Sequence, residues 1–272
     1  MKNYKKYIIF LVLAGTLLFI SCATNPLTGK STMAFVNNSS LFPESFQQYR
    51  AFLSENEVVT GTPEALMVDR IGRNIKEAAE KWLAAEGNSE YLKDYQWEYH
   101  LVNSKEVNAW CMPGGKIVIY TGILPLTQTE AGLATVMGHE VAHALLNHGQ
   151  QRMSAGILQQ LGAVGLSILT AGSSQGTQEL LMTGYGVGTT VFGTLPFSRD
   201  NESEADHYGL ILMAIAGYNP DESVPFWERM ASLGGGSIEF LSTHPSDTTR
   251  IRQLQQWIPE AKNKAREFGR SF

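Results

Sequence analysis

Cysteine is scarce in this 272-residue chain, with only Cys22 and Cys111 present. Two cysteines cannot build a disulfide framework, and no cysteine pair has zinc-finger spacing. Any metal site must therefore use histidine and carboxylate side chains. The chain is long enough, and at 43% hydrophobic residues apolar enough, for one sizeable globular domain or two small ones.

An excess of basic residues is also lacking. Lys and Arg number 21 against 26 Asp and Glu, which gives a formal net charge of −5. Nucleic-acid binding depends on a basic surface, so no nucleic-acid partner is expected. Residues 1–21 contain three lysines and no acid, so a chain without them would carry −5 − 3 = −8.

The N-terminal apolar run is too short for a membrane-spanning helix. It extends from Tyr7 to Ile20, 14 residues, behind Lys2, Lys5 and Lys6, whereas a span needs about 20. This order of basic and apolar regions predicts a signal peptide over residues 1–21.

Ser21-Cys22, at the end of that run, resembles a bacterial lipoprotein cleavage site. The resemblance implies lipidation of Cys22, with the protein anchored to the inner or outer membrane and facing the periplasm. Plain secretion and an uncleaved anchor remain alternatives.

Turn residues and hydrophobic periodicity divide the remainder of the chain. The polar residues 22–40 read as the lipidated N-terminus and a tether, followed by one domain over residues 41–272. Helices are predicted at Pro63–Glu86, Thr127–Asn147, Ser154–Thr170, Arg199–Ala216, Asp221–Ser232 and Asp247–Phe268. Strands are predicted at Tyr95–Val102 and Lys116–Tyr120, with a turn at Pro113–Gly115. This pattern indicates a mainly helical α+β fold with a small β-sheet.

One predicted helix carries a metal-binding pattern. Thr127 and Glu130 form a capping-box signature, and the helix then presents His139, Glu140 and His143. Histidines four residues apart share a helix face, so both imidazoles can bind one zinc ion. Glu140 lies about 100° round the helix, where it can contact a metal-activated water without displacing it. The alternative, a helix with solvated His and Glu, conflicts with the apolar flanks.

A second acidic helix supplies the predicted third ligand. Glu202 and Asp206 are four residues apart and share one face, whereas Glu204 points elsewhere and is expected to be solvated. We therefore assign Glu202 as a metal ligand and Asp206 as the acceptor of a ligating imidazole N–H. An ordinary acidic helix start, favoured by the helix dipole, is the simpler alternative.

A third ligand directly after the first motif is not expected. A metzincin would have Gly at position 146 and His at 149, and this chain has Leu146 and Gly149. His148 lies five residues after His143 and, beside Asn147, is interpreted as part of a helix C-terminus.

Together these motifs resemble the family-48 zinc metallopeptidases, which have a gluzincin-type fold. The matching segments are Asn108–Lys116, His139–His143, Glu202–Asp206, Ala216–Pro220 and His244–Arg250. The absence of several membrane-spanning segments makes the chain similar to the soluble lipoprotein branch of that family.

The resemblance implies roles for two further residues. His244 falls where relatives have a histidine that either stabilises the tetrahedral oxyanion or binds zinc as a reversible fourth ligand. Arg250 falls at the arginine of the same motif and, like His244, is counted among the catalytic residues. The strand Lys116–Tyr120 would by the same analogy offer its edge to an extended peptide substrate.

The stretch from Met153 to Leu195 allows two interpretations. A packed helix followed by a Gly-rich loop, residues 172–193, is the simpler one. A mobile cover over the active site is the other.

The sequence thus predicts an endopeptidase with one zinc ion per chain. The expected activity is cleavage of unfolded or misassembled envelope proteins through a metal-activated water, with Glu140 as general base. A zinc-binding chaperone or assembly factor with little proteolysis is the alternative function. A structural lipoprotein that binds no metal is the second alternative.

Overall fold

A computed structural model describes residues 22–170, 197–233, 239–244 and 249–272, without the side chains of 161–170. The chain divides into two compact units, residues 1–37 with 150–193 and residues 38–149 with 194–272. The predicted signal peptide and the Gly-rich stretch 172–193 lie outside the described residues. No helix among the described residues has both the length and the apolar character needed to cross a bilayer.

The first unit contains a short hairpin and most of one helix. Strands β1 (Cys22–Thr24) and β2 (Ser31–Met33) pair antiparallel, and the Asn25 side chain accepts the Leu27 N–H at 3.0 Å in the turn between them. Part of the predicted tether is therefore ordered as a hairpin. Helix α6 (His148–Thr170) belongs to this unit from Gln150 onward and begins before the predicted Ser154.

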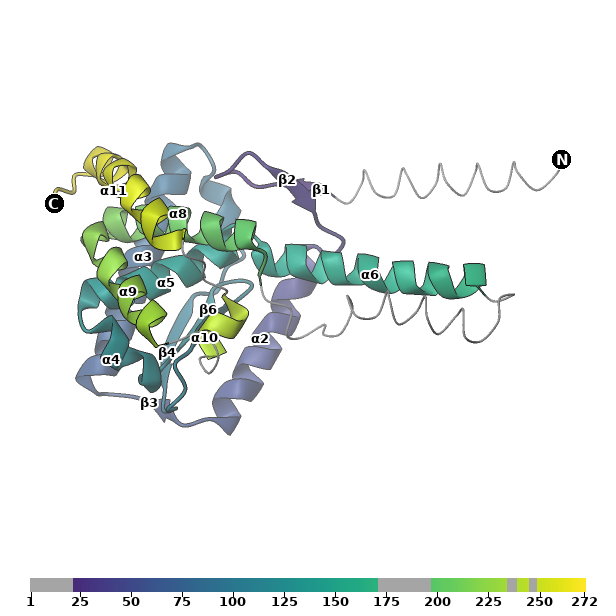
Figure 1. The fold of residues 1–272 in the computed structure, drawn as a ribbon, viewed down its shortest axis with the longest axis horizontal. Coiled ribbons are helices and arrows are strands. Elements are labelled where there is room, and N and C mark those ends of the chain that lie inside the picture. Colours follow the sequence, from purple (N-terminus) through teal and green to yellow (C-terminus); the bar gives the residue numbers. More distant parts are fainter. Residues whose placement is uncertain (1–21, 171–196, 234–238, 245–248) are drawn as a thin grey trace. The chain divides into compact units, whose positions relative to one another are not determined.

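The second unit contains a four-stranded sheet with helices on both faces (Figure 1). Its strands, in spatial order, are β3 (Val58–Val59), β4 (Glu98–Val102), β6 (Lys116–Tyr120) and β5 (Ala109–Met112). Strands β4 and β6 are parallel, and β5 returns antiparallel to β6. The predicted turn between β5 and β6 is confirmed: Gly114 and Gly115 have φ of 86° and 90°, which glycine adopts without a steric cost.

Helix α2 (Asn38–Glu55) covers one face of this sheet, and the sequence pattern did not reveal it. Tyr49 packs against Val102 and Val118 in a buried cluster. The Tyr49 hydroxyl lies 2.7 Å from His100 Nδ1 on β4. Helix α2 has little amphipathic pattern and begins in the polar stretch expected to be a tether, so its packing is a tertiary effect.

Helix α3 (Pro63–Ala85), which confirms the helix predicted at Pro63–Glu86, lies on the other face. Thr62 caps it by accepting the Ala65 N–H at 3.2 Å, and Pro63 occupies the first turn, where its missing N–H costs nothing. Gly72 faces Tyr99, and a Cβ at Gly72 would lie 2.3 Å from the Tyr99 ring. Because side chains alternate along strands, Tyr99 and His100 mark the two faces of the sheet.

The central helix of the unit is α5 (Glu130–Leu145), buried along nearly its whole length. Its N-cap is Thr129, which accepts the Gly132 N–H at 2.9 Å. The predicted capping box at Thr127 is therefore wrong. Thr127 is instead the last residue of a short helix, α4 (Leu124–Thr127). Gln128, at φ 58°, separates α4 from α5.

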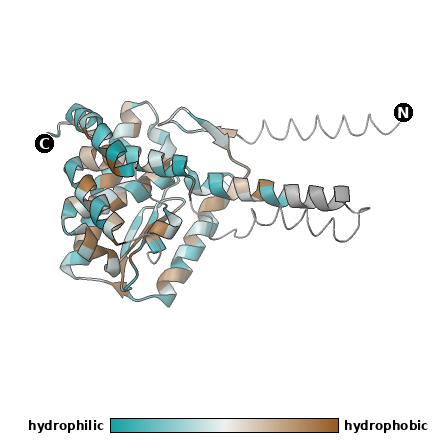
Figure 2. Ribbon diagram, viewed as in Figure 1, coloured by the Kyte–Doolittle hydropathy of each residue, from teal (hydrophilic) through white to brown (hydrophobic). Residues whose placement is uncertain are grey.

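The C-terminal part of the unit completes the helical layer. Its helices are α8 (Arg199–Ala216), α9 (Ser223–Ser232), α10 (Glu239–Thr243) and α11 (Arg250–Glu267). Helix α8 has the predicted bounds and ends at Gly217, φ 100°. Figure 2 shows α11 mostly in hydrophilic colours, as expected for an outer helix. The predicted fold class, mainly helical α+β with a small sheet, is confirmed.

Candidate metal centre

Helices α5 and α8 lie in direct backbone contact, and this contact places the candidate site. A Cβ on Gly138 would lie 2.7 Å from the carbonyl oxygen of Gly209, and one on Gly209 would lie 2.8 Å from Gly138. Real Cβ atoms do not approach backbone that closely, so only glycine permits this crossing. It sets His139, the residue after Gly138, directly against α8.

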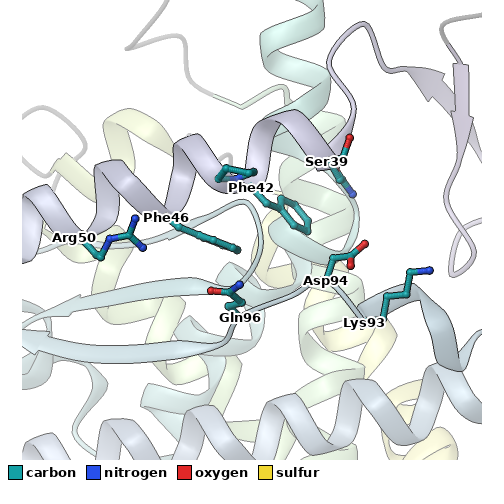
Figure 3. A pocket seen from close by; sticks show the side chains of 9 residues that line it. Ser39, Phe42, Phe46, Arg50, Lys93, Asp94 and Gln96 are labelled. Carbon is teal, nitrogen blue, oxygen red and sulfur yellow. The ribbon is translucent and has the colours of Figure 1, made fainter.

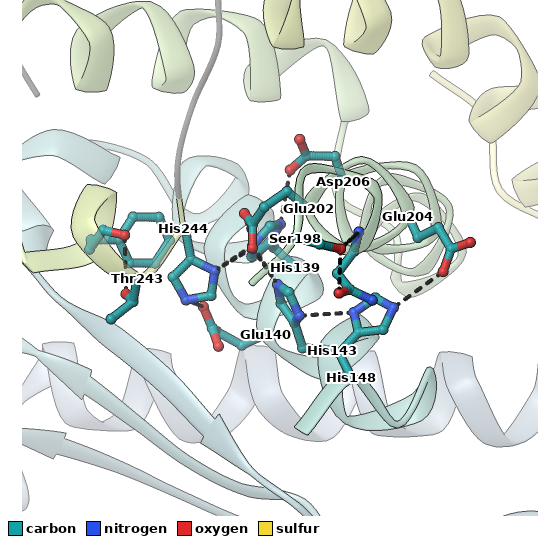
Figure 4. A network of polar contacts seen from close by, with 12 residues as sticks. His139, Glu140, His143, His148, Ser198, Glu202, Glu204, Asp206, Thr243 and His244 are labelled. Carbon is teal, nitrogen blue, oxygen red and sulfur yellow. Dashed lines mark hydrogen bonds and ion pairs between the residues drawn. The ribbon is translucent and has the colours of Figure 1, made fainter. Parts of the chain in front are cut away.

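The predicted metal ligands meet at this crossing (Figure 4). His139 Nε2 and His143 Nε2 are 3.0 Å apart. Glu202 Oε2 is 3.4 Å from the first nitrogen, and Glu202 Oε1 is 3.3 Å from the second. The donor atoms of these three residues and His244 all lie within 4.8 Å of one another, and the four side chains are buried.

The remaining ring nitrogens of both histidines have acceptors outside this cluster. Asp206 Oδ1 lies 2.9 Å from His139 Nδ1, as predicted for the second carboxylate of α8. His148 Nδ1 lies 2.9 Å from His143 Nδ1. With their Nδ1 atoms engaged in this way, both imidazoles direct Nε2 toward one point beside a carboxylate. Two imidazoles with one carboxylate fit zinc.

Arg250, the first residue of α11, holds two carboxylates of α8, those of Glu202 and Asp206. Its Nε donates to Asp206 Oδ2 at 2.5 Å, and its terminal nitrogen donates to Glu202 Oε2 at 2.7 Å. The guanidinium lies 3.9 Å from the centre of the Trp227 ring. Arg250 thus orients a metal ligand and the acceptor beside it.

His244 stands immediately after α10 and closes the fourth side of the cluster. Its Nδ1 is 3.0 Å from Glu202 Oε1 and 3.2 Å from His139 Nε2, and its Nε2 is 3.5 Å from Glu140 Oε1. The residue is buried and stacks on the Phe240 ring, with the ring centres 4.7 Å apart. His244 is therefore positioned among the metal donors.

Glu140 faces the sheet side of the cluster. The backbone of Cys111, on β5, hydrogen-bonds to its carboxylate. Its Oε1 is buried and has no hydrogen-bond partner among the described residues. Burial raises the pKa of Glu140, partly offset by His244 and His139. A carboxylate so placed can accept a proton from a water in the cluster.

Burial and neighbouring charges shift the pKa values of the proposed ligands in opposite directions. Burial lowers the pKa of His139, but hydrogen bonds with Asp206 and Glu202 outweigh it and raise the pKa to about 10. Burial holds the pKa of His143 well below its ordinary value. Burial would raise the pKa of Glu202, but hydrogen bonds with three histidines outweigh it and lower the pKa. Metal binding must therefore release a proton from His139.

Two residues at this site have contacts that the sequence pattern did not indicate. The end of α5 falls at Leu145, near the predicted position, and His148 begins the next helix with a fully buried side chain. Its Nε2 lies 3.2 Å from Glu204 Oε2. Glu204 is thus not the solvated side chain expected, because the chain reverses at Asn147 and brings His148 against α8.

The strand that was predicted to offer a free edge to substrate is not an edge strand. β6 (Lys116–Tyr120) is paired on both sides, with β4 and with β5. Next to β6, the last strand of the sheet is β5, and its residue Cys111 contacts Glu140. Strand order is a tertiary property, and the sequence pattern alone did not reveal β5.

A separate hollow of about 620 Å³ lies beside α2 (Figure 3). Phe42 and Phe46 project into it from α2, opposite Asp94 and Gln96. It contains none of the metal donors. The arrangement that can perform chemistry is therefore the cluster around His139.

The fold and the cluster together define a metallopeptidase domain of the gluzincin type, built on a His-Glu-x-x-His helix and a glutamate from a later helix. The chain belongs to Peptidase family M48, whose sequence profile matches residues 70–258.

The chain is also similar in sequence to several named proteases. Mitochondrial metalloendopeptidase OMA1 of Saccharomyces cerevisiae is 36% identical over 208 residues, which cover 73% of this chain and 57% of that protein. Its Schizosaccharomyces pombe counterpart is 37% identical, over 64% of this chain and 50% of that protein. The beta-barrel assembly-enhancing protease of Escherichia coli is 31% identical, over 63% of this chain and 35% of that protein. The matched region therefore spans between 35% and 57% of the length of these relatives.

Proposed function

We propose that this protein is a zinc-dependent endopeptidase that cleaves unfolded or misassembled proteins in the bacterial cell envelope. The observation that carries the proposal is the convergence of His139, His143 and Glu202, with the Glu140 carboxylate beside them, 3.5 Å from His244 Nε2. Zinc bound there would supply a Lewis acid that acidifies water and polarises a peptide carbonyl.

The general base in this mechanism is Glu140. Its carboxylate takes a proton from the attacking water as the oxygen adds to the peptide carbonyl carbon. It then gives that proton to the leaving amine nitrogen as the C–N bond breaks. Its raised pKa, caused by burial, suits both transfers, because a stronger base accepts the proton more readily and still returns it to an amine.

The substrate in this proposal is an extended peptide segment. Strand β5 lies at one end of the sheet and its residue Cys111 contacts the proposed base. A peptide added as a further strand along β5 would bring its backbone past Glu140. An unfolded segment satisfies this geometry, whereas a folded protein does not expose enough backbone.

Cys22 supports the proposed place of action. It follows an apolar run of signal-peptide length and is exposed at the start of β1. Acyl chains on Cys22 would attach the enzyme to the inner or outer membrane with the domain facing the periplasm. The name of the Escherichia coli relative, a beta-barrel assembly-enhancing protease, is consistent with such a setting.

A zinc-binding assembly factor with little proteolysis is favoured by one observation. His244 lies with the three proposed ligands in one donor set, and a catalytic zinc site requires an open position. An enzyme whose fourth position is filled by its own histidine would be latent until His244 moves. A protease that becomes active when His244 moves has the same donor set, so the observation is also compatible with the endopeptidase that we propose.

The variant Glu140→Gln tests the mechanism. It keeps the size of the side chain and removes the base, so zinc content should match that of the wild type while cleavage of casein falls at least a hundredfold. Glu130→Gln, at the exposed start of the same helix, is the control and should retain activity. Undiminished cleavage by the Glu140→Gln protein would refute the assignment, and a purified wild type that takes up no zinc would refute the proposed function.

A further inference from the structure

His148 and Glu204 form a chain of polar contacts behind one proposed metal ligand. His148 Nδ1 is 2.9 Å from His143 Nδ1, and His148 Nε2 is 3.2 Å from Glu204 Oε2 (Figure 4). His148 has no exposed surface, and the rings of His143 and His148 meet edge to face with centres 4.9 Å apart. Neither residue belongs to the donor cluster itself.

The hydrogen-bond roles in this chain of contacts follow from proton counting. An ionised Glu204 can only accept, so His148 Nε2 donates to it. A neutral imidazole has a single N–H, so His148 Nδ1 must accept the N–H of His143 Nδ1. His143 then has no proton on Nε2, and its lone pair faces Glu202 and His139. The opposite order of donors would place an N–H in the cluster and prevent metal binding.

The local backbone is shaped to bring His148 into this position. Asn147 has φ 57°, in the left-handed region, and ends α5 one turn after His143. The Asn147 side chain donates to the Tyr91 hydroxyl at 2.8 Å, and that hydroxyl donates to the Leu145 carbonyl at 2.8 Å. The reversal at Asn147 is therefore fixed by Tyr91.

Helix α8 supplies acceptors on two of its sides. Glu202 and Asp206 share the face toward His139, and Glu204, about 200° round from Glu202, reaches His148. From a second direction, the Phe197 ring stacks on His143 with the ring centres 4.1 Å apart, and its centre lies 6.3 Å from that of His148. The orientation of His143 is thus constrained from both directions.

We propose that His148 and Glu204 act as a positioning pair that fixes the tautomer and ring orientation of His143, as Asp206 does for His139. This role rests on the proposed metallopeptidase function and assigns His148 and Glu204 to its metal site. Residues that hydrogen-bond to metal-ligating imidazoles typically change metal affinity ten- to a hundredfold when altered. Both imidazole ligands of the site would then have a dedicated partner, one a carboxylate and one a histidine backed by a carboxylate.

Two variants and a matched control test the pair. Glu204→Gln replaces the obligate acceptor with an amide that can donate to His148, and His148→Phe removes the acceptor for His143. Asp200→Asn changes the same charge at an exposed position of the same helix and should behave like the wild type. Zinc dissociation constants, measured by competition with a chromogenic chelator, should rise ten- to a hundredfold in both variants.

A spectroscopic readout separates positioning from general structural support. In ¹⁵N-histidine NMR of the zinc-loaded wild type, His143 should be protonated on Nδ1, and His148 should be protonated on Nε2. In Glu204→Gln the His148 signals should shift toward the other tautomer, while the melting temperature without metal stays close to that of the wild type. Should His148→Phe fail to fold, Glu204→Gln decides alone.

Each result has a defined meaning. Unchanged zinc affinity and unchanged tautomers in Glu204→Gln would overturn the positioning pair, although a wild type that binds zinc and cleaves casein would still support the proposed function. Reversed protonation in the zinc-loaded wild type would also overturn it. A wild type that does not bind zinc would overturn both.

Discussion

Gly138 and Gly209 touch through their backbones where α5 crosses α8, and a Cβ on either residue would lie less than 3.0 Å from backbone atoms of the other helix. His139 is the residue after Gly138, Asp206 lies three residues before Gly209, and Glu202 lies one turn further back. The distance between the helices at this point therefore sets the distance between the imidazole and carboxylate ligands.

Substituting Gly209 should consequently disturb both stability and metal binding. Gly209→Ala should lower the free energy of unfolding by about 1–3 kcal/mol, because the added methyl group forces the helices apart. Zinc affinity should fall as well. Urea unfolding and chelator titration measure the two effects.

Gly149→Ala serves as the matched control for that substitution. A Cβ on Gly149 would lie 3.4 Å from the Pro113 ring, close to an ordinary contact. The substitution should leave stability nearly unchanged. Equal stability of the Gly209→Ala and Gly149→Ala proteins would show that the helix crossing tolerates a side chain.

Arg250→Lys should weaken the site although it preserves the charge. A lysine cannot donate to Glu202 and Asp206 in the bidentate arrangement of the guanidinium, so one buried carboxylate loses a partner. We expect a loss of roughly 1–3 kcal/mol in the free energy of unfolding, measured in urea, and weaker zinc binding. The exposed Arg252 on the same helix provides the control, Arg252→Lys. A fully stable Arg250→Lys protein with wild-type zinc affinity would contradict this role.

His244→Ala distinguishes the two roles that the family resemblance implies for this histidine. Because His244 lies within the donor cluster, its removal should open the fourth position and raise the rate of casein cleavage severalfold. An oxyanion-stabilising role would instead lower kcat by about a hundredfold. His207→Ala, at a partly exposed histidine that pairs with Glu260, controls for loss of a histidine elsewhere.

Stability should decline in strong alkali, partly because of Tyr91. Burial raises the pKa of Tyr91 to about 12, from 10.0 in an exposed side chain. The folded protein therefore retains a proton that the unfolded chain loses above pH 10. This contribution is complete below pH 10 and is lost as the pH rises through 12, by roughly 2–3 kcal/mol in total.

Tyr91→Phe should reduce the alkaline decline and also lower stability at neutral pH, because the hydroxyl bonds with Leu145 and Asn147 disappear. Urea unfolding at pH values from 8 to 12 measures both effects. Burial also raises the pKa of Tyr95, so the variant should still lose some stability in alkali. An identical pH profile for wild type and variant would show that Tyr91 ionises normally in the folded state.

Cys22→Ser tests the proposed lipid anchor. When the full chain is expressed in a bacterium, the wild type should sediment with membranes and require detergent for release. The Cys22→Ser protein should lose the acyl chains and appear in the soluble fraction or remain with an uncleaved signal segment. Cys111→Ser should behave like the wild type, and incorporation of labelled fatty acid into the Cys22→Ser protein at the wild-type level would exclude Cys22 as the lipidation site.

The sequence predicted those parts of the site that depend on local helix geometry. His139 and His143 lie on one face because they are four residues apart, and the same argument relates Glu202 to Asp206. Helix α3 carried clear periodicity and an N-terminal Pro.

The features that sequence reasoning missed depend on tertiary structure. Helix α2 is weakly amphipathic, and β5 has no alternating pattern, so neither was expected. The contact of His148 with Glu204 requires the left-handed turn at Asn147 and the α5–α8 crossing, which bring together residues 56 positions apart. The spacing of His143 and His148, with Asn147 between them, was the available signal for this contact.

The four donors come from three separate stretches of the chain, around residues 139–143, 202 and 244. An ion bound by all of them would act as a crosslink between segments that are distant in sequence, and would stabilise the folded chain by an amount that rises with the logarithm of the free metal concentration. At a zinc concentration 100 times the dissociation constant this amounts to about 2.7 kcal/mol. Thermal denaturation would then report metal occupancy, and zinc starvation would leave the protein more vulnerable to unfolding as well as inactive.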